Sequence, residues 1–466
     1  MQYISTRGNA PELGFEEAML TGLARDGGLY LPADVPVFSA DDIAAMAGLP
    51  YEEVAFRVMR PFIGETFSEP AFRALIAQAY AEFGHPARAP LKQLASGHFL
   101  LELFHGPTLA FKDLAMQLIG QLFQAALKRS GQRITIVGAT SGDTGSAAIE
   151  AFRGLDNVDV FILYPHGRVS DVQRRQMTTP AEANVHALAI DGDFDTCQAL
   201  VKDMFNDFGF RDRVGLAGVN SINWARVLAQ VVYFFSSAVA LGAPHRPVSF
   251  TVPTGNFGDI FAGSIARAMG LPIQKLVIAT NQNDILHRCL STGEYRTEAV
   301  QPSISPSMDI QVSSNFERAL FLAYGRDGRA VAQLMDELKS TGSFTVSQGA
   351  LQALREVYAS GRVSEEATRE TIARVHQETG ELLCPHSAVG VAVAEQHLGV
   401  APMITLATAH PAKFPDAVEA ATGLRPALPA RMADLFDRAE RVTRLTGELG
   451  AVQALILERT GHGGRI

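Results

Sequence analysis

The stretch RITIVGATSGDTGSAAIEAFRGLDNVDVFILYP, residues 133–165, decides the fold class. Its β-branched run at 133–139 predicts a buried strand that ends in a glycine turn, and the small residues after the turn predict a helix. VDVFILYP, residues 158–165, predicts a second buried strand ended by proline. A strand, helix and strand in this order are typical of a parallel sheet whose two faces are covered by helices, so we expect an α/β protein.

The same alternation continues on both sides of this stretch. NVHALAID and a helical run extend it, and VSFTVPTGNFGDIFAGSIARAMG with QKLVIATN forms a second strand–helix–strand unit. We therefore expect two α/β lobes, with ligands bound where strand ends face a crevice. The expected organisation is a mostly helical N-terminal segment at 1–92, a smaller lobe at 93–235 and a larger lobe at 236–466 with a helical insertion at about 284–377.

Composition excludes several classes of protein. The chain has 466 residues, 47% of them hydrophobic, which is enough for two or three domains. Only 19% are charged and the net charge is −9, which argues against nucleic acid or an acidic membrane surface as partner. The N-terminus lacks the layout of a signal peptide, and no apolar run reaches the ~18 residues of a membrane span. The three cysteines are far apart, so we expect free thiols, no metal site and a cytoplasmic protein.

Lys112 lies in an unusual setting, FHGPTLAFKDLAMQLIG, residues 104–120. Apolar spacing predicts a helix from Asp113, so Lys112 stands at its N-terminal edge. The helix dipole and a dry environment both disfavour an ammonium group there, so the amine could be neutral and reactive as a Schiff-base former or general base. The alternative is a Lys112–Asp113 surface pair.

Two glycine-rich turns each follow a predicted strand and open a helix. The first, SGDTG, contains Ser141, Gly142, Asp143 and Thr144, and the second, PTGNFGD, spans 253–259. Converging backbone N–H groups at such turns bind anions, although each alone could be an ordinary tight turn. A pair of them with one half-buried lysine indicates an anionic cofactor and an anionic substrate.

A third constellation, TLATAHPAKF, follows the last predicted strand. Thr408, His410 and Lys413 fall in this loop, where sites gather in α/β folds. His410 reads more simply as a structural histidine. Lys413 is a rival nucleophile, but it lacks a following helix pattern because Pro415 stands two residues on.

Eight collinear motifs resemble the threonine synthase family, in the variety found in enteric bacteria and fungi. They are LELFHGPTLAFKD, TSGDTGSAA, ILYPHGRVS, AIDGDFDTCQALVK, NSINWARVLAQVVYF, PTGNFGDIFAG, MDIQVSSNFERALF and TAHPAKFPDAVEA. The resemblance implies a pyridoxal-5′-phosphate enzyme with the two-lobed fold of the tryptophan-synthase-β type. Such enzymes convert O-phospho-L-homoserine and water into L-threonine and phosphate.

The resemblance also assigns roles to residues. Lys112 would form the Schiff base with the cofactor and later remove the substrate α-proton. Gly255, Asn256, Phe257, Gly258 and Asp259 would hold the cofactor phosphate, Thr408 would face the pyridine nitrogen, and the SGDTG loop would lie over the substrate carboxylate. The candidates for the substrate phosphate are Arg168, Arg318 with Asn315, and Lys413, since guanidinium suits bidentate phosphate binding.

Two other functions remain possible at this point. One is a related pyridoxal-phosphate phospho-lyase or dehydratase of the same fold type. The other is a nucleotide-binding regulatory protein that uses the two glycine loops. The threonine synthase interpretation predicts a small-molecule substrate and a monomer or homodimer.

Overall fold

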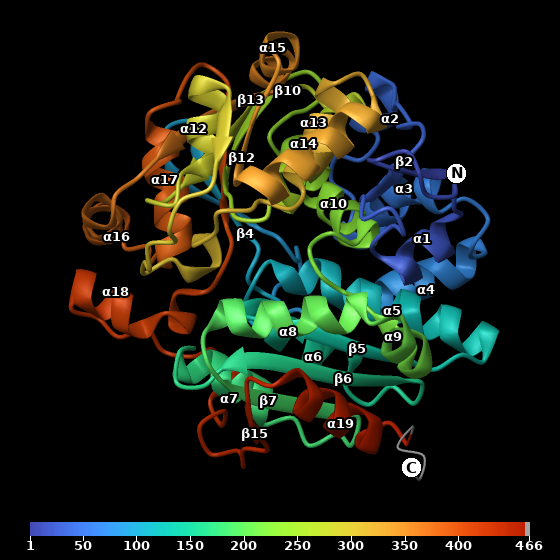
Figure 1. Ribbon diagram of the computed structural model, residues 1–466. Coiled ribbons are helices and arrows are strands. Elements are labelled where there is room, and N and C mark those ends of the chain that lie inside the picture. The colour runs from blue at the N-terminus through green and yellow to red at the C-terminus, as the bar shows by residue number, and fades with distance from the viewer. Residues whose placement is uncertain (462–466) are drawn as a thin grey trace. The chain divides into compact units, whose positions relative to one another are not determined.

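The computed structural model describes residues 1–461 of the chain, which divide into two units (Figure 1). Unit 1 contains Met1–Ala115 and Ser221–Pro426, and unit 2 contains Met116–Asn220 and the chain from Ala427 onward. Helix α5, Lys112–Ser130, begins in unit 1 and continues into unit 2. The chain therefore passes from one unit to the other three times.

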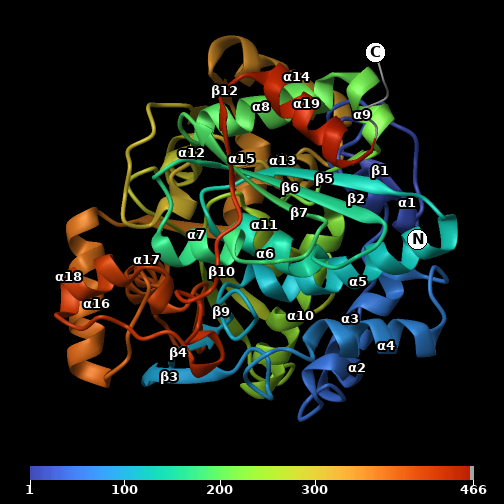
Figure 2. The same cartoon turned by 90° about the horizontal axis from the view of Figure 1, so that it is seen from below.

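Unit 2 is built on a five-stranded, fully parallel sheet in the order β15-β7-β6-β5-β8. Figure 2 shows β5, β6 and β7 side by side. The remaining elements of this unit, in chain order, are as follows: β5 Ile134–Ala139, α6 Asp143–Phe152, β6 Val158–Pro165, α7 Asp171–Thr178, β7 Val185–Asp191, α8 Phe194–Asn206, α9 Phe208–Val214, β8 Leu216–Ala217, η3 Ala430–Met432, β15 Thr443–Thr446 and α19 Leu449–Arg459.

Both faces of this sheet are apolar because its strands carry near-continuous hydrophobic runs. Phe161 and Leu163 of β6 point to one face, where α8, α9 and α19 cover them. Ile162, between them, points to the other face and contacts Gly145 of α6. This is the strand–helix–strand arrangement predicted from residues 133–165, and the expected α/β class with parallel sheets is confirmed.

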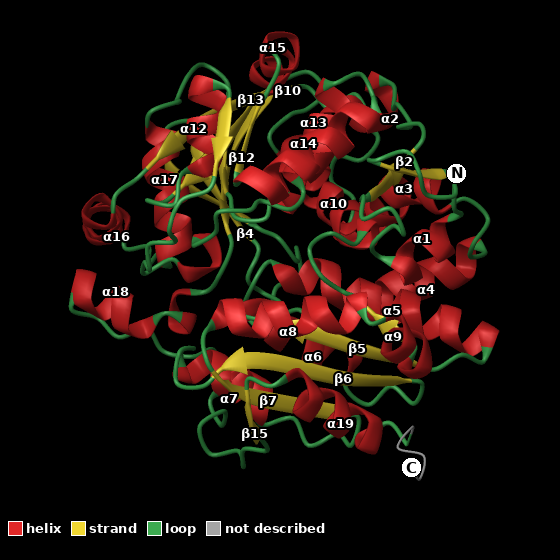
Figure 3. Cartoon of the chain, in the orientation of Figure 1, coloured by secondary structure: helices red, strands yellow, loops and turns green. Residues whose placement is uncertain are grey.

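Unit 1 is built on a six-stranded sheet in the order β13-β10-β9-β14-β4-β3, parallel except for β3. Figure 3 shows helices on both sides of its strands. Its elements up to α10 are β1 Tyr3–Ser5, α1 Phe15–Thr21, β2 Tyr30–Pro32, α2 Ala40–Ala44, α3 Tyr51–Ile63, α4 Glu69–Tyr80, β3 Leu91–Ala95, β4 His98–Glu102 and α10 Trp224–Ala240.

The rest of unit 1 follows α10 in chain order. These elements are β9 Val248–Pro253, α11 Gly258–Ala268, β10 Ile273–Thr280, α12 Ile285–Thr292, β11 Glu294–Arg296, η1 Pro306–Met308, α13 Phe316–Ala323, α14 Gly328–Thr341, β12 Ser343–Thr345, α15 Gln348–Val357, β13 Tyr358–Arg362, α16 Glu365–Thr379, α17 Pro385–Glu395, β14 Met403–Ala407, η2 Pro411–Lys413 and α18 Pro415–Thr422. Helix α17 packs on the face that carries Val277, and α10 packs on the opposite face against Phe250.

The units differ from the predicted lobes in three respects. Residues 427–461 belong to unit 2, because β15 pairs with β7 and α19 packs on α8. Residues 93–115 and 221–235 belong to unit 1, where β4 pairs with β14 and α10 packs on α11. The stretch 284–377 is interrupted by three short strands, one of which, β13, forms the edge of the large sheet.

Two further features concern the surroundings of the chain. Cys197, Cys289 and Cys384 are buried, and within residues 1–461 none of them forms a disulfide. Within residues 1–461, no helix combines the length and apolar character needed to cross a membrane.

Candidate active site

Lys112 is the first residue of α5 and is 8% exposed, as its sequence setting predicted. The turn before it wraps around the Asp113 carboxylate, which accepts hydrogen bonds from Thr108 N at 2.8 Å and Thr108 Oγ1 at 2.6 Å. A Cβ on Gly106 would lie 2.3 Å from Asp113 Cβ, so only glycine fits there. Asp113 is therefore committed to its own turn, which rules out the alternative of a surface Lys112–Asp113 pair.

The turn that carries Lys112 is joined to the loop that carries Thr408. Phe111 N donates to Thr408 O at 2.8 Å, and His410 N donates to Leu109 O at 3.0 Å. Residues 108–113 and 408–413 thus run side by side, and we call them the paired segments. Thr408 is also bonded to α17, because its N–H donates to Ser387 Oγ at 3.2 Å. The backbone consequently fixes Lys112 and Thr408 relative to each other.

The side chain of Lys413 adds a third connection between the paired segments. It is fully buried, and Nζ donates to Thr108 O at 2.7 Å. The pKa of Asp113 rises to about 6 because burial disfavours its charge, while the hydrogen bonds of Thr108 and the charge of Lys413 act in the opposite direction. This geometry does not support Lys413 as the rival nucleophile or the phosphate ligand considered from the sequence, because its amine is buried and donates to Thr108 O.

The loop at 254–259 forms a cradle between β9 and α11. Phe257 has φ of +64°, which is rare for a residue with a side chain, and its ring packs between Phe316 and Tyr358. A Cβ on Gly255 would lie 2.6 Å from Ser307 O, so the loop also requires glycine there. The first N–H groups of a helix have no partners inside it, so the start of α11 offers them to an anion.

Asn315 and Arg318, predicted to bind the substrate phosphate, hold this cradle in place. Asn315 Nδ2 donates to Asn256 O at 2.9 Å. Arg318 is fully buried and donates to Asn315 Oδ1, to Tyr30 O and to Ile222 O. These partners occupy Nε and both terminal nitrogens of the guanidinium, and burial lowers its pKa to about 9. The prediction that Arg318 contacts substrate finds no support in this geometry.

Asp259 is a buried acid in the first turn of α11. The residue is 7% exposed, and its carboxyl group accepts a hydrogen bond from the Tyr233 hydroxyl of α10. Burial raises its pKa to about 7, and the Tyr233 hydrogen bond and the charge of Lys112 lower it in part. Tyr233 was not among the predicted residues. The available indication was three polar residues, Arg226, Gln230 and Tyr233, on one face of an otherwise apolar helix.

Unit 2 carries the SGDTG loop at the carboxyl end of β5. Thr140 Oγ1 accepts hydrogen bonds from Gly142 N and Gly145 N, both at 2.9 Å, and this folds the loop over the start of α6. Asp143 is buried and accepts a hydrogen bond from Gln173 Nε2 at 2.9 Å. The side chains of Ser141 and Thr144 are half-buried.

Arg168 lies at the same edge of the unit 2 sheet. It follows β6, the parallel neighbour of β5, and its side chain is exposed. Its charge acts on Asp193, whose pKa is lowered chiefly by the backbone hydrogen bond from Thr196. Of the predicted cationic residues, Arg168 is the one whose side chain is open to a ligand.

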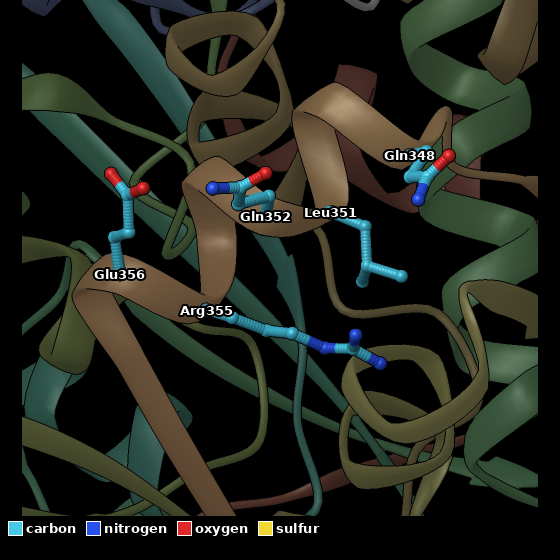
Figure 4. A pocket seen from close by; sticks show the side chains of 5 residues that line it. All are labelled: Gln348, Leu351, Gln352, Arg355 and Glu356. Atoms are coloured by element: carbon cyan, nitrogen blue, oxygen red, sulfur yellow. The ribbon is translucent and has the colours of Figure 1, made fainter.

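A surface hollow elsewhere in unit 1 contains none of the predicted residues. It is lined by residues of α15 alone: Gln348, Leu351, Gln352, Arg355 and Glu356 (Figure 4). Arg355 donates to Leu290 O at 2.7 Å and so ties α15 to α12. The hollow has no converging polar groups of the kind found at the paired segments.

The fold and the site define a class of protein. A family model described as pyridoxal-phosphate dependent enzyme matches residues 85–336, which include Lys112, both glycine loops and the first turn of α13. The residues fit that cofactor: a buried lysine amine, a glycine-dependent anion cradle at a helix start and a hydroxyl at Thr408. Two further models, described as threonine synthase N terminus and threonine synthase C-terminal, match residues 2–80 and 387–456.

Individual relatives give the same result. The chain is 56% identical over 469 residues to a threonine synthase from Pseudomonas aeruginosa, covering 100% of this chain and 99% of the relative. It is 44% identical over 452 residues to the threonine synthase of Saccharomyces cerevisiae, covering 89% of this chain and 88% of the relative. The crystal structure of pyridoxal-phosphate-bound threonine synthase from Brucella melitensis matches with a TM-score of 0.96 at 57% identity, covering 99% of each chain. The chain belongs to the threonine synthase family, and the resemblance drawn from its eight motifs is confirmed.

Proposed function

We propose that this chain converts O-phospho-L-homoserine and water into L-threonine and phosphate. The observation that carries the proposal is the junction of Lys112 and Thr408 through the paired segments, in the same unit as the α11 cradle. When bound there, pyridoxal phosphate supplies a ring that withdraws electrons from the substrate Cα. The residues present have to hold the cofactor and move protons.

Lys112 has two tasks in this proposal. Its Nζ would hold the cofactor covalently, and as a free amine it would take the proton from the substrate Cα. Both tasks need a neutral amine, and the buried position at the start of α5 favours that form, because burial and the helix dipole disfavour an ammonium ion.

Thr408 and the cradle orient the cofactor. We assign the Thr408 hydroxyl to the ring nitrogen of the cofactor, where a hydroxyl, unlike a carboxylate, would leave that nitrogen largely unprotonated. The backbone of residues 255–259 would hold the cofactor phosphate at the start of α11, and Asn315 and Arg318 support this loop through their hydrogen bonds.

Unit 2 supplies the anion-binding groups that we assign to the substrate. The half-buried hydroxyls of Ser141 and Thr144 and the N–H groups at the start of α6 suit a carboxylate, with Gly142 giving the loop its close approach and Asp143 holding it to Gln173. The exposed guanidinium of Arg168 suits the phosphate. We also propose that the protein works in the cytoplasm, which is supported by the lack of disulfides among the three cysteines of the described residues.

Product analysis with a trapping experiment tests the proposal. The purified protein with O-phospho-L-homoserine should release threonine and phosphate in equal amounts. Borohydride reduction should leave a pyridoxyl group on Lys112, located by mass spectrometry. Lys112→Ala should lower kcat by about 10³-fold or more and abolish the label.

Lys128→Ala is the matched control, because Lys128 is an exposed lysine in the last turn of the same helix. It should keep both activity and label. Formation of α-ketobutyrate without threonine would favour the phospho-lyase or dehydratase alternative. A colourless protein that cannot be reconstituted with cofactor would favour the nucleotide-binding alternative.

A further inference from the structure

The start of α13 is bonded to the backbone of the cofactor cradle. Asn315 Nδ2 donates to Asn256 O at 2.9 Å, and Asn315 N donates to the same carbonyl group at 3.0 Å. The carbonyl group of Gly255 accepts a hydrogen bond from Ser313 Oγ at 2.6 Å. The residues that lead into α13 therefore fix the carbonyl groups of two residues of the cradle.

Arg318, in the first turn of α13, connects the same place to β2. Its guanidinium donates to Asn315 Oδ1, and it also donates to Tyr30 O, from Nε at 3.1 Å and from Nη2 at 2.6 Å. Tyr30 is the first residue of β2, which pairs antiparallel with β1. One buried guanidinium thus contacts both the side chain that holds the cradle and the second strand of the chain.

Glu317, the neighbour of Arg318, binds the two residues that follow β1. Its carboxylate accepts hydrogen bonds from Thr6 Oγ1 at 2.6 Å and from Arg7 Nε and Nη2, both at 3.1 Å. The guanidinium of Arg7 meets both carboxylate oxygens, which fixes the mutual orientation of the two groups. The side chain of Glu317 is 8% exposed and that of Arg7 is 24% exposed, so water and salt screen this ion pair little.

Close backbone packing supports these contacts. A Cβ on Gly328, the first residue of α14, would lie 2.8 Å from Arg7 C and 2.9 Å from Gly8 N. A Cβ on Gly28 would lie 2.2 Å from Ser5 Oγ. The chain after β1 can approach its neighbours this closely because both positions are glycine. We call β1, β2, Thr6 and Arg7 the N-terminal ribbon.

We propose that the N-terminal ribbon is a positioning element for the cofactor. It holds the start of α13 through Arg7 and Tyr30 O, and α13 holds the backbone of the cradle in the arrangement that accepts a phosphate. Arg7 and Glu317 act through Asn315 and are positioning residues. The inference rests on the proposed function in one respect, the assignment of the cofactor phosphate to residues 255–259.

Titration of the cofactor-free full chain with pyridoxal 5′-phosphate, and separately with pyridoxal, tests the proposal. The two compounds differ by the phosphate group alone, so a change in the cradle should affect binding of the first and spare the second. Arg7→Ala should lower the affinity for pyridoxal phosphate about 5-fold or more and leave the affinity for pyridoxal unchanged. Arg7→Lys keeps the charge but loses the two-pronged contact, so its affinity should fall between those of Arg7→Ala and the unaltered chain.

Arg133→Ala is the matched control. Arg133 also donates from two nitrogens to a buried acid, Asp159 of unit 2, at 3.0 and 2.8 Å. Its loss removes an ion pair of the same kind and should leave the affinity for both compounds unchanged. Equal affinity of Arg7→Ala and the unaltered chain for pyridoxal phosphate overturns the proposal. An equal loss for pyridoxal overturns it as well, since the whole site and not the cradle would then have been disturbed.

Hydrogen exchange followed by mass spectrometry gives a second measurement that does not depend on activity. Coupling between two sites is reciprocal, so saturation of the cofactor-free chain with pyridoxal phosphate should slow amide exchange in residues 3–8 and 29–32. The slowing should be kept in Arg133→Ala and lost in Arg7→Ala. Slowing of the same size in Arg7→Ala would overturn the inference alone. Absence of threonine as a product, in a chain that shows these effects, would overturn the proposed function alone.

Discussion

Asp113 and Asp259 are both buried acids near Lys112, yet their environments differ. Asp113 accepts hydrogen bonds from the backbone and side chain of Thr108 and faces Lys413, whereas Asp259 accepts one hydrogen bond, from Tyr233. Burial raises the pKa of both, to about 6 for Asp113 and about 7 for Asp259. Asp259 has fewer hydrogen-bond donors than Asp113, so burial destabilises its ionised form more.

Asp259→Asn is therefore expected to stabilise the cofactor-free protein at alkaline pH. The folded pKa of about 7 lies above the unfolded value of 3.8, so the stability that Asp259 contributes in its protonated form is lost as pH rises through 7. At pH 8 the substitution should raise the free energy of unfolding by on the order of 2–4 kcal/mol. Urea unfolding followed by circular dichroism measures it.

The difference between the two proteins should shrink steadily as pH falls from 8 towards 4, because Asp259 then becomes protonated in both states. An advantage of the variant that is the same at every pH would show that packing, and not the charge of Asp259, is responsible. If Asp259 serves activity, its substitution should raise stability and lower activity together, as is common for residues of active sites.

Single residues also mark how far the sequence could predict the site. Lys112, the two glycine loops and Thr408 could be proposed from the sequence because turns, strand ends and helix starts are local patterns. Their positive charge makes Arg318 and Lys413 candidates for the substrate phosphate, but both side chains are fully buried and donate to groups of the protein. Which way a cation turns depends on distant carbonyl groups, such as Tyr30 O, and no local pattern records these.

Among the elements, the paired segments hold the centre of the site. Residues 108–113 and 408–413 are connected by two backbone hydrogen bonds and by the amine of Lys413 on Thr108 O. Asp113 and Lys413, one on each segment, are both fully buried and of opposite charge. Removing one of two such charges leaves the other uncompensated.

A double-mutant cycle measures this coupling. Lys413→Met should lower the free energy of unfolding at pH 7 by about 3–5 kcal/mol, because Asp113 is left as a buried, unbalanced acid. Asp113→Asn should cost less in the Lys413→Met background than in the unaltered protein, with a coupling of about 1–3 kcal/mol. Urea unfolding of the four proteins gives the values, and strictly additive losses would contradict the pairing.

The sequence did not predict β13, a strand that pairs with residues distant in the chain. The stretch 284–377 reads as helical, and most of it is, but Tyr358–Arg362 forms β13 because β10 offers it a parallel edge. A run such as YASGR has little strand character of its own, so pairing with residues 276–280 decides its structure.

At the scale of the whole molecule, each unit is made of two separated pieces of chain. Residues from Ala427 onward return to unit 2, where β15 extends the sheet beside β7. Val452 and Ile456 of α19 are fully buried against α8. The last part of the chain therefore completes the core of a unit that began more than two hundred residues earlier, with Met116.

Truncation after Pro426 should destabilise unit 2 selectively. Loss of Val452 and Ile456 alone removes about 3–6 kcal/mol of apolar burial, and the edge of β7 loses its partner. Hydrogen exchange followed by mass spectrometry should show lost protection in β5, β6 and β7 and retained protection in β9 and β10. Equal loss in both sheets would contradict the division into units.

The return of the chain also sets the order in which the protein can be completed during synthesis. Asp191 of β7 and its partner Arg444 of β15 are 253 positions apart. At about 5–20 residues per second, the ribosome needs roughly 13–50 s to make the chain between them. For that interval β7 is an open sheet edge, the kind of surface at which wrong pairing starts and chaperones bind. Pairing with β15 closes this edge only after residues 443–446 have left the ribosome.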